Sequence, residues 1–122
     1  MTKVVFYKSG DSFWGFEEHG HTGFAESGED IVCSALSAMT MLVINAIEVS
    51  YASSVDYVID DETGNLKLTA CGALPDHESD EKKRYAISGL IMAYYYQLND
   101  LIEEYGDYLD VELIEKKFEG EQ

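Results

Sequence analysis

The run IVCSALSAMTMLVINAI, residues 31–47, contains no charged residue and fixes the centre of the predicted fold. Its length approaches that of a membrane-spanning helix, but acids rather than Lys or Arg flank it, and it carries five polar residues. These are Cys33, Ser34, Ser37, Thr40 and Asn45. We therefore predict a buried central helix that runs to about Val49, covered by a sheet on one face and by another element on the other. No membrane is predicted as a partner.

A hairpin is predicted on either side of this helix. Upstream, residues 2–9 (TKVVFYKS) and 12–20 (SFWGFEEHG) are rich in β-branched and aromatic residues and are separated by a Gly-Asp turn. Downstream, residues 53–60 and 61–72 alternate between apolar and polar residues across a turn at Thr63-Gly64-Asn65. Grouped strands of this kind are typical of antiparallel pairing.

The C-terminal third of the chain predicts one more helix and one more strand. Apolar residues recur at spacings of three and four within residues 76–106, and residues 108–118 alternate as a strand does, with Lys116 and Lys117 suited to a sheet edge. The predicted order is ββαββαβ. It indicates a single α+β domain over residues 1–122, with two long helices packed against a mostly antiparallel sheet.

The composition limits the classes of partner. The chain holds 24 acidic and 8 basic residues, for a net charge of −16, so that phosphate backbones and anionic lipids are repelled. A basic protein or peptide would instead be attracted, although an acidic surface also serves solubility. The N-terminus MTKVVFYKSG lacks the long apolar segment of an export signal, and two cysteines form no disulfide framework, so we expect a cytoplasmic protein.

Cys33 is the first candidate for chemistry. It is predicted within the first turn of the central helix, where unpaired amides and the helix dipole stabilise a thiolate. The helix start has two alternatives, with either Asp30 or Ser27 as the N-cap. A cysteine early in an apolar helix is also commonly a small buried hydrophobic residue without reactivity. Cys71, beside Gly72 at a predicted strand end, is interpreted in that structural way.

His21 is the candidate base for that thiol. Residues 20–29 are predicted to form a loop, because Gly20, Gly23 and Gly28 allow conformations closed to other residues. Such a loop can fold back and bring an imidazole beside the helix, where thiolate and imidazolium form a pair. His19 is a close rival, but it is predicted at the end of a strand rather than in the loop.

Asp30 and Ser37 are supporting candidates. Asp30 can orient the imidazole or cap the helix, and its charge would raise the pKa of a neighbouring thiol. Ser37 follows Cys33 by one helical turn and can hydrogen-bond toward the site or back to the Cys33 carbonyl. A zinc site built from both histidines and Cys33 is a further alternative, but the spacing fits no closed structural pattern. We therefore predict neither a metal nor a cofactor.

The whole stretch GHTGFAESGEDIVCSALSAMTMLVINAIE, residues 20–48, resembles the signature of the ribosomal-processing cysteine protease family, Prp. The Gly-His pair, the run from Gly28 to Cys33, Ser37 and the separation of His21 from Cys33 carry the resemblance. The order of hairpins and helices extends it over nearly the whole chain. Thr22 is a departure, because a small Ala is common there.

The resemblance implies that Cys33 is the nucleophile, that His21 is the general base, and that Asp30 matches an acidic position of the motif. It further implies a homodimer that removes a short N-terminal extension from a large-subunit ribosomal protein, with a glycine-rich loop that moves to admit substrate. The leading hypothesis is thus a cysteine endopeptidase. The alternative is a non-catalytic acidic module that binds a basic ribosomal protein or assembly factor, with Cys33 buried and inert.

Overall fold

The computed structural model describes residues 1–20, 27–60 and 62–118 and confirms the predicted order of elements. The elements are β1 (Thr2–Ser9), β2 (Ser12–His19), α1 (Ser27–Asn45), β3 (Asp56–Ile59), β4 (Leu66–Thr69), α2 (Glu81–Tyr105) and β5 (Leu109–Glu115). A π-helical segment, η1 (Ala46–Ser50), continues α1, and a short 3-10 helix, η2 (Cys71–Ala73), follows β4.

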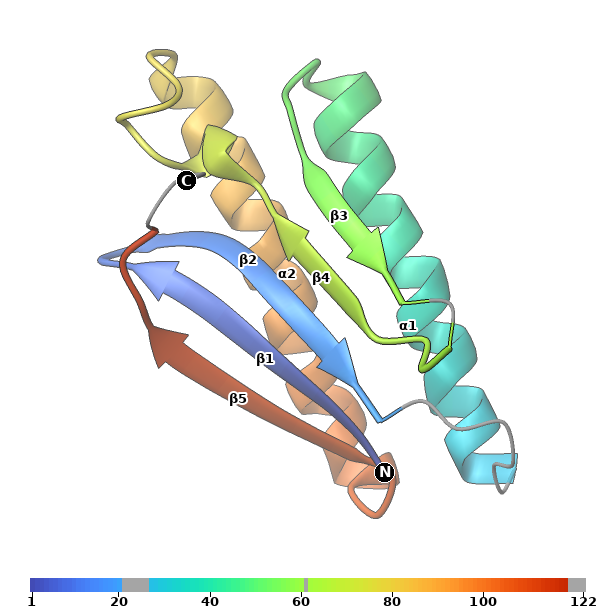
Figure 1. The fold of residues 1–122 in the computed structure, drawn as a ribbon. Helices are drawn as coiled ribbons and strands as arrows, with labels where there is room; N and C mark the ends of the chain where they lie inside the picture. The colour runs from blue at the N-terminus through green and yellow to red at the C-terminus, as the bar shows by residue number, and fades with distance from the viewer. Residues whose placement is uncertain (21–26, 61, 119–122) are drawn as a thin grey trace.

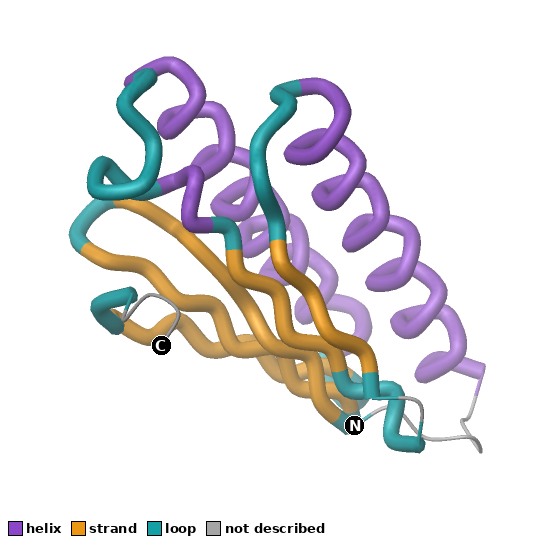
Figure 2. The backbone as a smooth tube through the Cα atoms, turned by 45° about the horizontal axis from the view of Figure 1, so that its top comes forward, coloured by secondary structure: helices purple, strands orange, loops and turns teal. Residues whose placement is uncertain are grey.

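The strands form one sheet in the order β3-β4-β2-β1-β5 (Figure 1). All neighbours pair antiparallel except β1 and β5, which are parallel. Both long helices lie on the same face of this sheet (Figure 2). The fold is therefore α+β with a mostly antiparallel sheet, as predicted, and β5 is an edge strand, as its lysines indicated.

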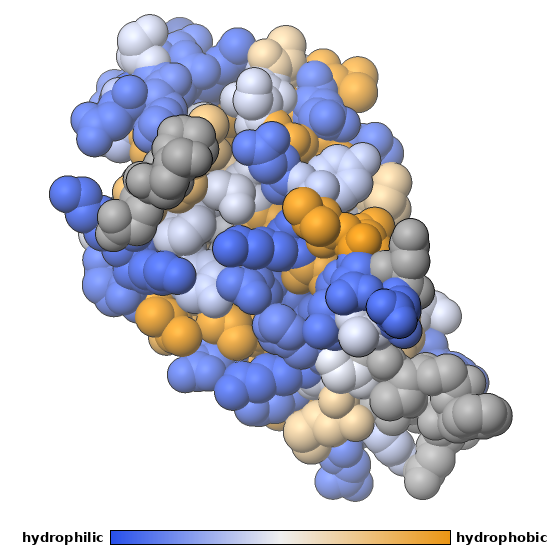
Figure 3. Space-filling view, viewed as in Figure 1, coloured by the Kyte–Doolittle hydropathy of each residue, from blue (hydrophilic) through white to orange (hydrophobic). Residues whose placement is uncertain are grey.

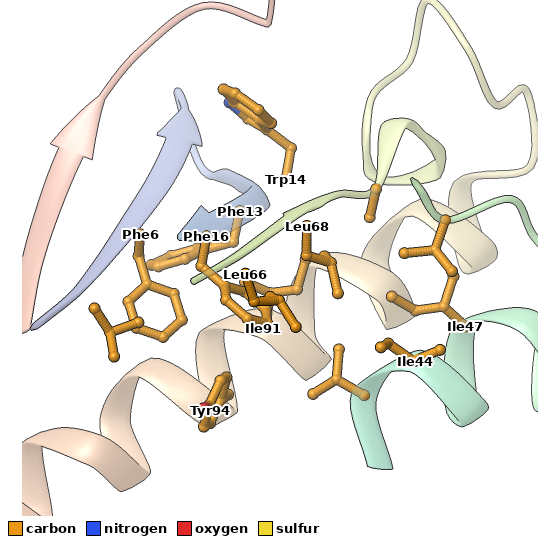
Figure 4. Packing of buried hydrophobic residues seen from close by; sticks show 14 of the residues in the cluster. Phe6, Phe13, Trp14, Phe16, Ile44, Ile47, Leu66, Leu68, Ile91 and Tyr94 are labelled. Atoms are coloured by element: carbon orange, nitrogen blue, oxygen red, sulfur yellow. The ribbon is translucent and has the colours of Figure 1, made fainter. Parts of the chain in front are cut away.

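The core fills the space between the sheet and the two helices (Figure 4). Alternate residues of β1 and β2 face the helices, and the Phe6 and Phe16 rings lie 5.4 Å apart, with Tyr94 of α2 against both. Trp14 points the other way, onto the outer face of the sheet, where its indole donates a hydrogen bond to the Lys116 carbonyl at 2.8 Å. A β-bulge in the β1–β2 ladder, which leaves Trp14 without a Cα partner, turns this side chain away from the face that Phe16 occupies.

The helix α1 departs from the prediction that it is covered on nearly all sides. Met41 and Leu42 of α1 and Val49 of η1 are 50%, 64% and 75% exposed, because only one layer of helices packs on the sheet and nothing within the described chain covers their outer side. The span Asp30–Ser50 is long and apolar enough to cross a membrane by length and composition, a test that core helices of soluble proteins also pass. One long face of α1 is therefore apolar and open.

Candidate active site

Cys33 projects from α1 toward the first residue of the sheet. Its sulfur lies 3.9 Å from the hydroxyl oxygen of Thr2, which is fully buried at the start of β1. The Cys33 side chain itself is only partly buried, and neither cysteine of the chain forms a disulfide. A partly accessible thiol thus lies where α1 meets one end of the sheet.

The start of α1 corrects the sequence-based position of this thiol. The helix begins at Ser27, near the second of the two predicted starts, so that Asp30 lies within the first turn instead of at the N-cap. Gly28 belongs to this helix and not to the predicted loop. Cys33 consequently lies in the second turn, and the dipole effect expected of a first-turn residue falls off before it.

The end of β2 lies beside the same corner. Gly20 has a φ of +89°, and a Cβ there would meet the Met1 carbonyl oxygen and lie 3.5 Å from the Thr2 Cα. Its amide donates to the Asn65 side-chain oxygen at 3.3 Å. Only glycine fits this position without strain. The residue that directly precedes His21 in the chain is therefore packed against Thr2, whose hydroxyl contacts Cys33.

The predicted site residues divide into those that the structure describes and those that it does not. His21 and Gly23 lie outside the described residues. Asp30 and Ser37 are both exposed on α1, on the turns before and after Cys33. Cys71 is the first residue of η2, far along the chain from these residues and in another element.

His19, the rival base, lies on the wrong face of the sheet. Its Nε2 atom is 3.3 Å from a carboxylate oxygen of Glu17, two residues earlier on the same face of β2. Successive strand side chains point to opposite faces, and Glu18 between them points toward the helices. Cys33 lies on the helix side. This separation argues against His19 as the base, and the assignment to His21 stays a prediction.

A buried carboxylate near the site was missed by the sequence analysis. Glu18 is 3% exposed and accepts hydrogen bonds from the Thr40 hydroxyl at 2.6 Å and the Tyr94 hydroxyl at 3.0 Å. The group joins β2, α1 and α2, and burial, together with the Glu18 charge, raises the pKa of Tyr94. The signal was present in the sequence, because strand alternation from Phe16 places Glu18 on the core face.

No group of three or more His, Cys, Asp or Glu residues that could hold a metal ion occurs within residues 1–20, 27–60 and 62–118. The zinc alternative required His19 and Cys33 together with His21. The first two are on opposite faces of the sheet, so this described pair cannot share an ion without rearrangement.

Comparison with known proteins shows to which class of protein the chain belongs. The family model described as "Cysteine protease Prp" matches residues 1–110. The chain is 30% identical over 96 residues to the ribosomal processing cysteine protease Prp of Bacillus subtilis (strain 168), which covers 79% of this chain and 81% of that protein. The fold is thus that of a cysteine protease family. The chain belongs to the cysteine protease Prp family.

Solved structures have the same fold. The SMU.848 protein of Streptococcus mutans superposes with a TM-score of 0.77 at 25% identity, covering 95% of this chain and 99% of that one. The essential ribosomal processing protease Prp of S. aureus, in complex with a substrate peptide, superposes with a TM-score of 0.72 at 20% identity, covering 95% and 100%. The predicted α+β architecture is confirmed by both.

Proposed function

We propose that this chain is a cysteine endopeptidase that removes a short N-terminal extension from a large-subunit ribosomal protein during ribosome maturation. The observation that carries the proposal is the packing of Gly20, the neighbour of His21, against Thr2, whose hydroxyl contacts the Cys33 sulfur. Family membership supports the class of reaction, and the names of the Bacillus and S. aureus relatives support ribosomal processing.

In this proposal Cys33 and His21 form the catalytic pair. The His21 imidazole accepts the thiol proton, and the sulfur attacks the scissile carbonyl carbon. The carbon–nitrogen bond then breaks, the imidazolium returns the proton to the leaving amine, and water hydrolyses the thioester to release the new carboxylate. The Thr2 hydroxyl is near enough to donate a hydrogen bond to the thiolate. A covalently linked product peptide in the S. aureus protease is consistent with such an intermediate.

Supporting roles are proposed for the residues around the pair. Asp30, exposed one turn before Cys33, would bias the imidazole toward its charged form, and Ser37 would hydrogen-bond at the edge of the site. Gly20 and Gly23 would allow the segment that contains His21 to open for substrate, whereas Gly28 belongs to α1. No cofactor takes part in this reaction.

The substrate class follows from charge. A chain with a net charge of −16 attracts basic polypeptides and repels nucleic acid and anionic membranes, and ribosomal proteins are strongly basic. The partner would be the unassembled ribosomal protein rather than its RNA. This reaction belongs in the cytoplasm, where ribosomes are assembled.

The decisive experiment compares two cysteine variants. Purified wild type, Cys33→Ala and Cys71→Ala are each incubated with the extended ribosomal protein from the same organism, and the products are weighed by mass spectrometry. We expect wild type and Cys71→Ala to shorten the substrate and Cys33→Ala to leave it whole. Cleavage by Cys33→Ala would refute the assignment. Tight binding by wild type without cleavage would favour the acidic binding module instead.

We also propose that the functional unit is a homodimer held together by the open face of α1. A hollow between α1 and α2, lined mainly by apolar residues such as Met39, Leu42 and Leu90, continues this face. A second copy would remove the exposed apolar surface from water. Sedimentation should find a dimer for wild type and for Tyr85→Ser, which alters an exposed side chain on α2, but a monomer for Leu42→Glu.

A further inference from the structure

The strand β3 is an edge strand with an unusual surface. Its outer edge faces no other strand of the described residues, and Tyr57, Val58 and Ile59 are 42%, 69% and 52% exposed. Seen from the side away from the helices, an apolar patch lies over β3 (Figure 3). Proteins normally protect such an edge with charged residues, prolines or bulges, because its unpaired amides and carbonyls can pair with strands of other chains. Here the edge is kept apolar over three consecutive residues.

The backbone groups that face outward can be assigned from the ladder. The Asp60 amide donates to the Asn65 carbonyl at 2.8 Å, and the register pairs Val58 with Lys67 and Ile59 with Leu66. In an antiparallel pair, alternate residues bond to the neighbouring strand. The amides and carbonyls of Tyr57 and Ile59 therefore point away from β4 and are available to an added strand.

The surroundings of this edge select a kind of occupant. Asp56 and Asp60, both exposed, lie at its two ends. Beside it lies a hollow with two acids, one lysine and one histidine in its lining, which consists of Glu17, His19, Val58, Asp60, Asn65, Leu66 and Lys67. An extended segment with apolar side chains and flanking Lys or Arg residues would match the apolar strand, the hollow and the acids.

A second copy of this chain matches the edge poorly. Full antiparallel pairing of β3 with itself would be centred on Val58 and would place Asp56 opposite Asp60 of the other copy, twice. Like charges directly opposite each other destabilise a strand pair, and each whole chain carries a net charge of −16. The apolar face of α1 has no such charge at its centre. A dimer formed through α1 and a peptide bound at the β3 edge would therefore use different surfaces.

The edge is within reach of the candidate site. Four strand spacings separate a strand added outside β3 from β1, or about 19 Å, which an extended chain covers in about six residues. The turn that follows β3 contributes Asn65, whose side chain accepts the Gly20 amide hydrogen bond. A peptide seated on β3 can therefore continue to the corner of Thr2 and Cys33.

We propose that the open edge of β3 binds an extended segment of the basic substrate as an added strand, a few residues away from the bond that is cut. The inference rests on the proposed proteolytic function and adds a docking surface to it. Main-chain bonds to Tyr57 and Ile59 supply affinity, and Asp56 and Asp60 select basic flanks. The pairing contributes to binding and leaves the chemical step at Cys33 unchanged.

The test replaces an outward amide on each edge of the sheet. Ile59→Pro removes an outward amide of β3, whereas the control Leu113→Pro changes β5, the opposite edge. For the full-length ribosomal protein we expect Ile59→Pro to raise KM about tenfold with kcat nearly unchanged, as loss of one or two backbone hydrogen bonds predicts. Leu113→Pro should keep the wild-type KM. A peptide too short to reach β3 should be cut equally by all three proteins.

Asp56→Lys provides a second variant whose backbone remains intact. It should raise KM for the basic substrate, with the larger effect at low salt. A wild-type KM in both Ile59→Pro and Asp56→Lys would overturn the docking surface while the protease assignment stood. A changed oligomeric state in Ile59→Pro would assign the edge to a second copy and overturn it as well. Failure of wild type to cleave would remove the proposed function and this inference together.

Discussion

Cys33 lies one turn deeper in α1 than the sequence predicted. Its thiol lies in the second turn of α1, beside the buried Thr2, and not among the unpaired amides of the first turn. Any activation of the thiol must then come chiefly from a neighbouring base, and His21 is the proposed one. Cys71, in η2, offers an internal reference in the same molecule.

This difference predicts how the two thiols react with iodoacetamide. At neutral pH we expect Cys33 to be alkylated faster than Cys71, and we expect His21→Ala to slow Cys33 about tenfold, because the thiolate would lose its imidazolium partner. The rate at Cys71 should not change. The measurement is peptide mapping of the modified protein over time. Equal rates at both thiols, or an unchanged Cys33 in His21→Ala, would argue against the catalytic pair.

Tyr7 gives a prediction about alkaline stability. Burial, together with the hydrogen bond that its hydroxyl donates to Glu17 at 2.8 Å, raises its pKa to about 12. A pKa raised in the folded state contributes stability that is complete below the unfolded value of about 10 and is lost as pH rises through the folded value. Tyr7→Phe should therefore be less stable than wild type at pH 9 or so and lose this disadvantage by about pH 12.

The measurement for Tyr7 is the free energy of unfolding in denaturant across that pH range. Tyr94 and Tyr105, whose pKa values are also raised, remain in both proteins, so that the difference between the two curves isolates Tyr7. Tyr85→Phe changes an exposed phenol and serves as the control. A constant gap between wild type and Tyr7→Phe at all pH values would contradict the assigned shift.

At the scale of elements, local signals predicted the hairpins and missed the tertiary environment of α1. The first hairpin appears almost residue for residue, because Gly10, at a φ of +60°, marks its turn and alternation fixes its arms. The start of α1 was ambiguous, since residues 20–29 have a loop-like composition. Its burial was overestimated, because apolarity does not reveal how many layers will cover a helix.

The same limit applies to the candidate site. Cys33 and His21 could be nominated from chemistry and from the family motif, but the contact with Thr2 joins residues far apart in sequence. Likewise, strand alternation could place Glu18 inward, whereas its partners on α1 and α2 depend on how the two helices pack. Contacts between elements are set by packing that no local pattern encodes.

We predict that the hydrogen bond from Thr40 to Glu18 helps to hold α1 on the sheet. Thr40→Val keeps the shape of the side chain but removes the 2.6 Å hydrogen bond to a buried carboxylate, which should cost about 1–3 kcal/mol of stability. Because Thr40 lies two turns beyond Cys33 on α1, the variant should also change the alkylation rate of Cys33. Chemical denaturation measures the first effect and peptide mapping the second. Ser34→Val, at an exposed position on the same helix, is the control.

Two other results for Thr40→Val would limit the role of Glu18. If Thr40→Val were as stable as Ser34→Val, the hydrogen bond would contribute nothing net and the carboxylate would be held by its other contacts. If stability fell while the alkylation rate of Cys33 stayed constant, the hydrogen bonds of Glu18 would stabilise the fold without influencing the thiol.

At the scale of the whole molecule, a single layer of helices leaves distinct surfaces for distinct tasks. The open face of α1 is apolar and suited to a second copy, the β3 edge is apolar with acids at its ends, and the corner of Thr2 and Gly20 carries the thiol. The net charge of −16 belongs to the chain as a whole. The proposed attraction of a basic polypeptide would therefore depend on the whole chain as well as on the β3 edge.

This charge predicts a strong dependence of the reaction on salt. Attraction between a chain of net charge −16 and a basic substrate is screened beyond a Debye length of about 10 Å at 0.1 M salt, so that kcat/KM for the full-length ribosomal protein should fall as ionic strength rises. An uncharged peptide that spans only the cleavage site should be cut at a rate nearly independent of salt. Steady-state kinetics on both substrates measure the contrast. Equal salt sensitivity would place the charge effect at Cys33 and His21 themselves, and no salt sensitivity would mean that the acidic surface serves solubility and does not guide the substrate.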